Sequence, residues 1–164
     1  MVGVNLSKAE QVYLHIIKNL QDRPNFGKTL FYKVLYFSDF DYYERFEKSI
    51  TGDKYRRITH GPAPCTFDII IKRLKEKDMI RELHFHYGMG TQIRYCYHGD
   101  DKTDKLAKEE IKEIDRNIQR LSGMTASQAS AYSHQDMPCK VTKLDEIIDY
   151  DLVHYRNPIF SVSD

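Results

Sequence analysis

Residues 28–46 carry the densest run of large aromatic residues in the chain and predict one buried helix. Leu30, Val34 and Phe37 lie in one row at helical spacing, and apolar residues occupy nearly every other face as well. Such a pattern is typical of a helix with neighbours on several sides. A buried tyrosine hydroxyl needs a hydrogen-bond partner, so we expect some of its tyrosines to reach a polar seam or the surface. The aromatic residues of this stretch are Phe31, Tyr32, Tyr36, Phe37, Phe40, Tyr42, Tyr43 and Phe46.

Four further stretches carry apolar residues at helical spacing: residues 7–23, 67–77, 104–121 and 125–137. Ser7 and Glu10 fit a capping box at the start of the first stretch. Residues 104–121 are the most clearly amphipathic, with a narrow apolar stripe and charges of both signs elsewhere. Pro138 is expected to end the last helix, because proline cannot continue the backbone hydrogen-bond pattern.

Alternating apolar positions predict a β-hairpin at about residues 79–98. The strand candidates are residues 79–87 and 91–97, and the turn Gly88-Met89-Gly90 joins them. A short basic helix is predicted directly before this hairpin. The middle of the chain is therefore similar to a winged helix, in which a hairpin follows a helix that reads DNA.

The segment between the central helix and the basic helix carries two different signals. Residues 55–59 alternate in character and predict a short extended piece. Residues 60–64, His-Gly-Pro-Ala-Pro, predict a rigid turn, because each proline lacks a backbone donor and restricts the residue before it. We expect Gly61, Pro62 and Pro64 to act structurally by directing the chain into the next helix.

These elements predict a single α+β domain over residues 1–164, predominantly helical, with a helical core around one buried aromatic helix and a small β-hairpin. The 25 Lys and Arg nearly balance the 24 Asp and Glu, so a net charge of +1 gives no global electrostatic reason to expect a nucleic-acid partner. The N-terminus lacks the apolar segment of a signal peptide, and no apolar run reaches the roughly 18 residues of a membrane span. We therefore expect a cytoplasmic protein with no membrane partner.

The sequence contains no phosphate-binding loop, dinucleotide-binding, zinc-protease or nucleophile-elbow motif. Asp39 and Asp41 are two residues apart on a predicted helix, so their carboxylates point in different directions. Cys65 and His60 could be drawn as a nucleophile and its base, but nothing in the sequence shows that they meet. The cysteines lack the CxxC spacing of zinc and redox sites, and we expect free thiols in a reducing compartment. They are Cys65, Cys96 and Cys139.

Histidines cluster in the predicted hairpin. His84 and His86 alternate along one strand and share a face, and His98 could lie close. Three histidines invite a zinc site, but no pattern of supporting carboxylates accompanies them, and exposed strand histidines are the simpler interpretation. We therefore expect no metal site, no cofactor and no catalytic set.

Three motifs occur in a characteristic order along the chain. The aromatic helix carries K-T-L-F-Y-K-V-L-Y-F-S-D-F; Thr51-Gly52-Asp53-Lys54-Tyr55 then precedes the His-Gly-Pro-Ala-Pro stretch; and a late helix ends in Ser133-His134. In this order, over about residues 5–155, the chain resembles the SocA-like antitoxin domain, also called the Panacea domain. The family usually carries Pro-Trp soon after that histidine, whereas this chain has Pro138-Cys139, so the role of the tryptophan does not carry over. The resemblance marks as structural motif residues Lys33, Tyr36, Asp39, Gly52, Gly61, Pro62, Pro64 and His134.

The resemblance implies a non-enzymatic antitoxin that neutralises a cognate protein toxin by direct binding. Relatives of the SocA type instead act as adaptors that deliver the toxin to the ClpXP protease, which gives one alternative. A second alternative is a winged-helix-like DNA-binding repressor, because residues 48–81 hold nine Lys and Arg against four acids. A third is a hydrolase that uses Cys65 or the histidines, which the missing motifs disfavour.

The expected contact surface for the toxin combines basic and aromatic residues from two parts of the chain. Arginine and tyrosine dominate binding hot spots, and basic charge would steer an acidic partner surface toward the protein. The predicted contact residues are Tyr55, Arg56, Arg57, His60, His84, His86 and Arg94.

Overall fold

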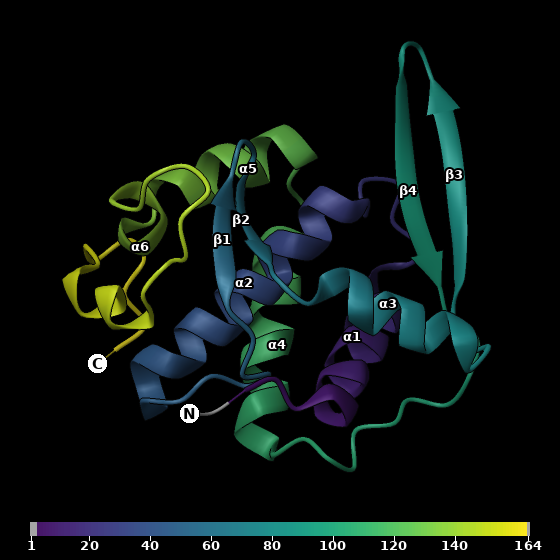
Figure 1. Ribbon diagram of the computed structural model, residues 1–164, viewed down its shortest axis with the longest axis horizontal. Coiled ribbons are helices and arrows are strands. Elements are labelled where there is room, and N and C mark those ends of the chain that lie inside the picture. Colours follow the sequence, from purple (N-terminus) through teal and green to yellow (C-terminus); the bar gives the residue numbers. More distant parts are fainter. Residues whose placement is uncertain (1–2, 164) are drawn as a thin grey trace.

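The computed structural model describes residues 3–163 and shows a group of helices from which one β-hairpin projects (Figure 1). The helices are α1 (Leu6–Leu20), α2 (Lys28–Phe46), α3 (Phe67–Glu76), α4 (Lys108–Leu121), α5 (Ala126–Gln135), α6 (Met137–Lys140) and the 3-10 helix η1 (Tyr150–Tyr155). The strands are β1 (Tyr55–Ile58), β2 (Gly61–Pro64), β3 (Arg81–Tyr87) and β4 (Gly90–Cys96). The expected α+β fold dominated by helices is confirmed.

Helix α2 lies at the centre of the fold, as its apolar pattern predicts. It contacts α4, α5, β2, β4 and η1, so neighbours cover most of its faces. Phe31, Phe37 and Phe40 are fully buried. The ring of Phe31 meets those of Tyr13 from α1 and Phe67 from α3, each with centroids 5.2 Å apart. Such aromatic contacts join three helices in one core.

Helix α1 begins differently from the predicted capping box. Asn5 is the N-cap residue, and its side-chain oxygen accepts a hydrogen bond from the Lys8 backbone N–H at 3.1 Å. Glu10 instead forms ion pairs with Arg73 at 2.8 Å and Lys77 at 2.7 Å. The capping-box interpretation of Ser7 and Glu10 is therefore wrong, because Glu10 faces α3 rather than the start of its own helix.

The His-Gly-Pro-Ala-Pro stretch is a strand rather than the predicted turn. Residues 61–64 form β2, which pairs antiparallel with β1 from Tyr55↔Pro64 to Ile58↔Gly61. Only Thr59 and His60 connect the two strands. Two prolines are tolerated because β2 pairs with β1 alone and so lies at an edge, where a missing N–H breaks no further bond. The chain then enters α3 after two residues, so the stretch still directs that helix.

The projecting hairpin β3–β4 is confirmed, with a tighter turn than expected. Tyr87 pairs with Gly90, so the turn consists of Gly88 and Met89 only. Gly88 has a φ of +55°, which glycine adopts readily and which suits the first position of a two-residue hairpin turn. Figure 1 shows the hairpin standing clear of the helices, with its base beside α3. At that base Tyr95 is buried in the core.

In the C-terminal third of the chain, the helices begin and end at other residues than the sequence pattern predicts. Helix α4 begins at Lys108 rather than at residue 104, because the Glu110 carboxylate accepts from the Ala107 N–H at 2.7 Å and caps the helix there. Pro138 lies in the first turn of α6, where proline is tolerated, and α5 already ends at Gln135. The chain from α6 to η1 then returns over the end of α2 (Figure 1).

Candidate functional site

A buried arginine joins the C-terminal segment to α2. The side chain of Arg156 is fully buried, and its Nε and Nη2 donate to the two carboxylate oxygens of Asp136 at 2.9 and 2.7 Å. Its Nη1 donates to Asp41 at 2.8 Å and to Glu44 at 3.0 Å. Burial opposes the charge of Arg156, but the carboxylates of Asp41 and Asp136 raise its pKa above the ordinary value. Three segments far apart in the sequence therefore meet at one guanidinium.

The carboxylates around this arginine are held by further donors. The Tyr36 hydroxyl donates to Asp136 at 2.8 Å, which is the polar seam expected for a tyrosine of α2. Burial raises the pKa of Asp136, although Arg156 and Tyr36 act in the opposite direction. Burial also acts to raise the pKa of Glu44, but hydrogen bonds from Ser161, Arg156 and other donors lower it to about 2. The cluster is satisfied by its own members and so serves the fold.

Asp39 points the other way from Asp41, as expected, and organises the loop before β1. Its Oδ1 accepts from the backbone N–H groups of Ile50 and Thr51 at 2.8 and 2.9 Å. Its Oδ2 accepts from the hydroxyls of Thr51 and Tyr55, both at 2.6 Å. Burial raises the pKa of Asp39 to about 6 despite these four donors.

The loop closes tightly at Gly52. Its φ is +78°, and a Cβ there would lie 2.5 Å from the carbonyl oxygen of Gly3. Both features favour glycine. The Thr-Gly-Asp motif is thus a loop built around the carboxylate of Asp39.

The remaining motif residues meet around a buried lysine. Lys33 is fully buried, and its Nζ donates to the carbonyl oxygen of Pro62 at 3.0 Å. Burial lowers the pKa of Lys33 to about 7, with a small opposing effect from Cys139. Gly61 has a φ of +108°, and a Cβ there would lie 2.6 Å from Ser133 Oγ and 3.2 Å from Lys33 Nζ. Motifs separated by about a hundred residues therefore form one packed contact between α2, β2, α5 and α6.

His134 lies at the rim of the same region. Burial lowers the pKa of His134, and the positive charge of Arg57 acts in the same direction. Cys139 is fully buried, and burial raises the pKa of its thiol to about 11. A buried thiol with a raised pKa is a poor nucleophile. This region is consistent with packing rather than with catalysis.

The predicted contact residues divide into one interior residue and several surface ones. Tyr55 is buried, and its hydroxyl donates to Asp39 and to the Leu35 carbonyl oxygen at 2.9 Å. It faces the core because alternate residues of β1 point inward. Its expected place on the contact surface is therefore wrong.

Arg56 and Arg57 are partly engaged inside the chain. The Arg56 guanidinium donates to the Asp145 carbonyl oxygen, and that of Arg57 donates to the Thr142 carbonyl oxygen. The backbone of Arg57 also accepts from the Asp145 N–H at 2.7 Å. These arginines hold the segment after α6 against β1, and Arg56 stays exposed. His60 is exposed at the hairpin turn, where its carbonyl oxygen accepts from Ser130 Oγ of α5 at 2.6 Å.

The two hairpin histidines occupy one face of β3 and have separate partners. His84 Nε2 lies 2.8 Å from a Glu82 carboxylate oxygen, and His86 Nδ1 lies 3.0 Å from Thr91 Oγ1. Among residues 3–163, His84, His86 and His98 are not brought together as a metal-ligand set. The zinc alternative therefore finds no support in their geometry.

Arg94 lies on the opposite face of the hairpin. Its guanidinium donates to the carbonyl oxygens of Gln21 and Arg23, both at 2.9 Å, and lies 4.9 Å from the centre of the Phe85 ring. It fixes the hairpin to the loop between α1 and α2. On this face Phe85 and Tyr87 remain 43% and 63% exposed, which is unusual for large apolar side chains at adjacent same-face positions.

A groove of about 570 Å³ separates this face from the start of α5. We name it the hairpin–α5 groove; its lining comprises Pro24, Asn25, residues 85–87, Gln92, Arg94 and residues 125–127. Helix α5 also contacts the β1–β2 turn through Ser130 and His60. The two halves of the predicted contact surface therefore lie on either side of α5. The sequence offered no sign of this, because α5 consists mostly of small Ala and Ser residues without a distinctive pattern.

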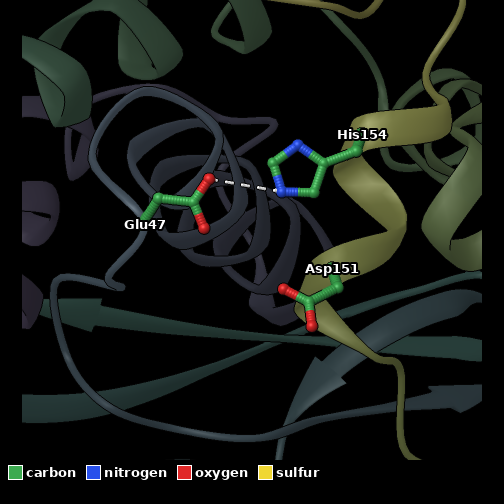
Figure 2. A group of neighbouring side chains, drawn as sticks. All are labelled: Glu47, Asp151 and His154. Carbon is green, nitrogen blue, oxygen red and sulfur yellow. Dashed lines mark ion pairs between the residues drawn. The ribbon is translucent and has the colours of Figure 1, made fainter.

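A second group of chemically capable side chains lies at the far end of α2. Figure 2 shows the His154 ring facing the Glu47 carboxylate, with Asp151 beside them. His154 Nε2 lies 3.3 Å from Glu47, and Asp151 accepts from the Tyr43 hydroxyl at 2.5 Å. The three ligand atoms lie within 4.8 Å of one another, and all three residues are exposed. Two carboxylates and an imidazole can bind a divalent cation, but here the ion pair and the hydrogen bond already join η1 to α2.

Within the described part of the chain, every helix is too short or too polar to cross a bilayer. The family model for the antitoxin SocA-like Panacea domain matches residues 31–139, from the first turn of α2 into α6. Comparisons with curated proteins and with solved structures gave no match. The matched range contains the loop around Asp39, the contact around Lys33 and both hairpins. The chain therefore belongs to the family of SocA-like antitoxins that carry the Panacea domain.

Proposed function

We propose that this protein is the antitoxin of a toxin–antitoxin pair and neutralises a cognate toxin by stoichiometric binding, without turnover. Membership of the SocA-like family carries the proposal. The packed motifs support it, because Lys33, Asp39 and Cys139 are buried and have no access to a substrate. The three cysteines are free thiols, which fits neutralisation in the reducing cytoplasm.

The proposed contact surface is the hairpin–α5 groove together with the β1–β2 turn. Phe85 and Tyr87 offer apolar area for anchor residues, and Arg94 lies beside them in a fixed orientation. Arg56, His60 and His86 add polar and basic groups around this area. A toxin surface with an apolar centre and acidic groups at its margin would match this arrangement.

Titration of the purified protein against the toxin encoded in the adjacent reading frame tests the proposal. Rescue should be complete at about one equivalent, as stoichiometric binding at concentrations above the Kd requires. Tyr87→Glu should weaken neutralisation without a change in Tm, because the side chain is exposed in the groove. The matched control is Ile69→Glu on α3, which places the same charge at a residue that is 52% exposed and outside the groove.

Two outcomes would contradict direct neutralisation. Full rescue far below one equivalent would indicate an enzyme that modifies the toxin. Rescue only in the presence of intact ClpXP would indicate the proteolytic-adaptor mode.

The DNA-binding alternative is weakened by how the basic residues are used. Arg73 and Lys77 pair with Glu10, and Lys75 pairs with Glu82. Charges neutralised in this way contribute less to phosphate binding. A gel-shift assay on the chain's own promoter separates this repressor function from toxin neutralisation.

A further inference from the structure

Strand β3 has one open edge along its whole length. It pairs with β4 without a bulge from Arg81↔Cys96 to Tyr87↔Gly90, and these two strands make up the entire sheet. Figure 1 shows β3 on the outer side of the hairpin, away from the helices. Proteins usually protect such edges with proline, lysine, a bulge or a covering segment. The sequence of β3, R-E-L-H-F-H-Y, contains neither proline nor lysine.

The two-residue turn determines which backbone groups face outward. The residues that flank such a turn, Tyr87 and Gly90, exchange both backbone hydrogen bonds, and bonded and non-bonded pairs then alternate along the hairpin. The odd-numbered residues of β3 therefore bond to β4. The N–H and C=O groups of Glu82, His84 and His86 point away from β4 and are available to another strand.

The side chains along this edge are complementary to a second copy of themselves. Antiparallel pairing of β3 with β3 matches donors to acceptors only when even-numbered residues oppose even-numbered ones. In the register centred on His84, Glu82 opposes His86 on both sides of the two-fold axis. Leu83 then opposes Phe85, and both are more than 40% exposed in the single chain.

The neighbouring register centred on Phe85 is less favourable. It places His84 opposite His86 and moves Glu82 opposite the turn. Within its own chain Glu82 already contacts Lys75 and His84, but each carboxylate oxygen can accept more than one hydrogen bond. The register centred on Leu83 also joins acid to imidazole, Glu82 to His84, but it leaves His86 and Tyr87 without a β3 partner. Only the register centred on His84 both joins acid to imidazole and pairs β3 with itself over its whole length, from Arg81 to Tyr87.

We propose that a second copy of this chain binds the β3 edge in this register, and that the two hairpins form one four-stranded antiparallel sheet. The contact is isologous, so the same edge serves both copies and no free edge of β3 remains. The faces that carry Phe85 and Tyr87 lie on the same side of the joint sheet and form one wider apolar surface. The antiparallel arrangement directs the helices of the two copies to opposite ends of the sheet. This dimer does not depend on the proposed toxin binding.

Two charge variants and their mixture test the register. Glu82→Lys places lysine opposite His86, and His86→Glu places two acids opposite each other, each twice per dimer. Sedimentation equilibrium should show the wild-type chain as a dimer at about 100 µM and each variant with a dimer Kd raised about tenfold. An equimolar mixture of the two variants should recover the wild-type Kd, because in the mixed dimer each Glu again faces a Lys or a His that can donate a hydrogen bond to it. Ile159→Lys is the control, because it adds a positive charge at a residue that is 77% exposed and lies outside the hairpin.

Several outcomes would overturn the proposal. A wild-type chain that remains monomeric at that concentration excludes the dimer. Variants that stay fully dimeric, or a mixture that does not recover, exclude this register. Hydrogen exchange on the wild-type chain provides a readout that needs no substitution: the amides of Glu82, His84 and His86 should exchange slowly at high concentration and rapidly on dilution. Concentration-independent exchange at all three amides would equally exclude pairing at this edge.

Discussion

Lys33 shows how strongly this interior acts on a single ionisable side chain. Its ammonium group donates a hydrogen bond to the Pro62 carbonyl oxygen. Within the described residues, no carboxylate forms an ion pair with it. A lysine in such surroundings loses its proton more readily than in water, because burial disfavours the charged form. The core therefore contains a residue that destabilises the fold whenever it is charged.

Replacing Lys33 by Met should stabilise the protein at neutral and acidic pH. The folded-state pKa is about 7, so the unfolded chain binds more protons between there and the ordinary lysine pKa, and stability rises with pH across this window. Below this window the wild-type chain carries the full cost of burying the charged ammonium group, on the order of 1.4 kcal/mol per unit of pKa difference. Lys33→Met removes this cost but also loses the hydrogen bond to Pro62, which partly offsets the gain in stability.

Urea unfolding at about pH 6 and about pH 10 measures this effect. The gain of Lys33→Met over the wild type should be a few kcal/mol at the lower pH and should vanish or reverse at the higher one. Lys48→Met, at an exposed lysine, should change stability little at either pH. An equal gain at both pH values would mean that apolar packing, and not the charge, limits stability at this position.

Gly61 should tolerate no larger side chain. Its φ of +108° and the 2.6 Å approach of a Cβ to Ser133 Oγ both disfavour substitution, so Gly61→Val should cost on the order of 1–3 kcal/mol or more. Adding Ser133→Ala should recover part of this loss by removing the contact but not the backbone strain. Chemical denaturation of both variants measures these losses. A Gly61→Val protein with an unchanged Tm but lost toxin binding would show that strand β2 acts as a contact site and not as a structural element.

At the scale of elements, α2 carries the core. Phe37 is fully buried between α5 and the C-terminal segment, where its ring lies 5.3 Å from Tyr132 and 6.3 Å from Phe160. Phe37→Ala should therefore cost roughly 2–5 kcal/mol, since a large cavity remains. Phe46→Ala, on the same helix but 44% exposed, should cost less than about 1 kcal/mol. Thermal melts compare the two variants. Equally small losses of stability would show that the core does not depend on α2.

Elements with a strong period were predictable, and those fixed by distant partners were not. The patterns at residues 28–46 and about 79–98 locate α2 and the projecting hairpin, because burial imposes the helical and strand periods directly. The strand β2 was hidden by its prolines, which indicate a turn unless an edge position is known. The N-cap at Asn5 was hidden by an equally good signal at Ser7.

The candidate site was predictable only in part. His60, His84 and His86 are polar residues in or beside a hairpin, and the structure places them at the surface. Tyr55 is also a polar residue of a hairpin strand, but it lies on the inward face of β1 and its hydroxyl donates to the buried carboxylate of Asp39, so it is part of the core. The groove beside α5 depends on three segments meeting in space, which no local pattern encodes.

At the scale of the whole molecule, a few charged groups join segments that lie far apart in the sequence. Arg156 lies 115 residues from Asp41, yet they bond directly at 2.8 Å. Removing the cation would leave Asp41, Glu44 and Asp136 buried without it. Arg156→Met should therefore cost about 3–5 kcal/mol near neutral pH.

The loss in Arg156→Met should also depend on pH. Without the guanidinium, the folded-state pKa values of the buried carboxylates rise above their unfolded values, so the folded variant takes up protons and its stability falls as pH rises above the unfolded pKa. The wild-type chain should show a weaker trend, because Arg156 opposes the effect of burial on the pKa of Asp136 and helps to lower the pKa of Glu44 to about 2. Denaturation midpoints across the acidic range would reveal it, and a pH-independent loss would show that packing alone is affected.

Arg156 lies beyond residues 31–139, the part of the chain that matches the family. The segment that carries η1 and Arg156 is therefore needed for the matched part to fold. A protease that cut the chain before η1 would remove the guanidinium from Glu44 and Asp136 and leave Asp41 with Arg120 as its remaining cation, so a single cut would strongly destabilise the fold. The lifetime of this protein in the cell would then be set by access to the segment around η1, and the proposed toxin complex would be lost through an event far from the projecting hairpin (Figure 1).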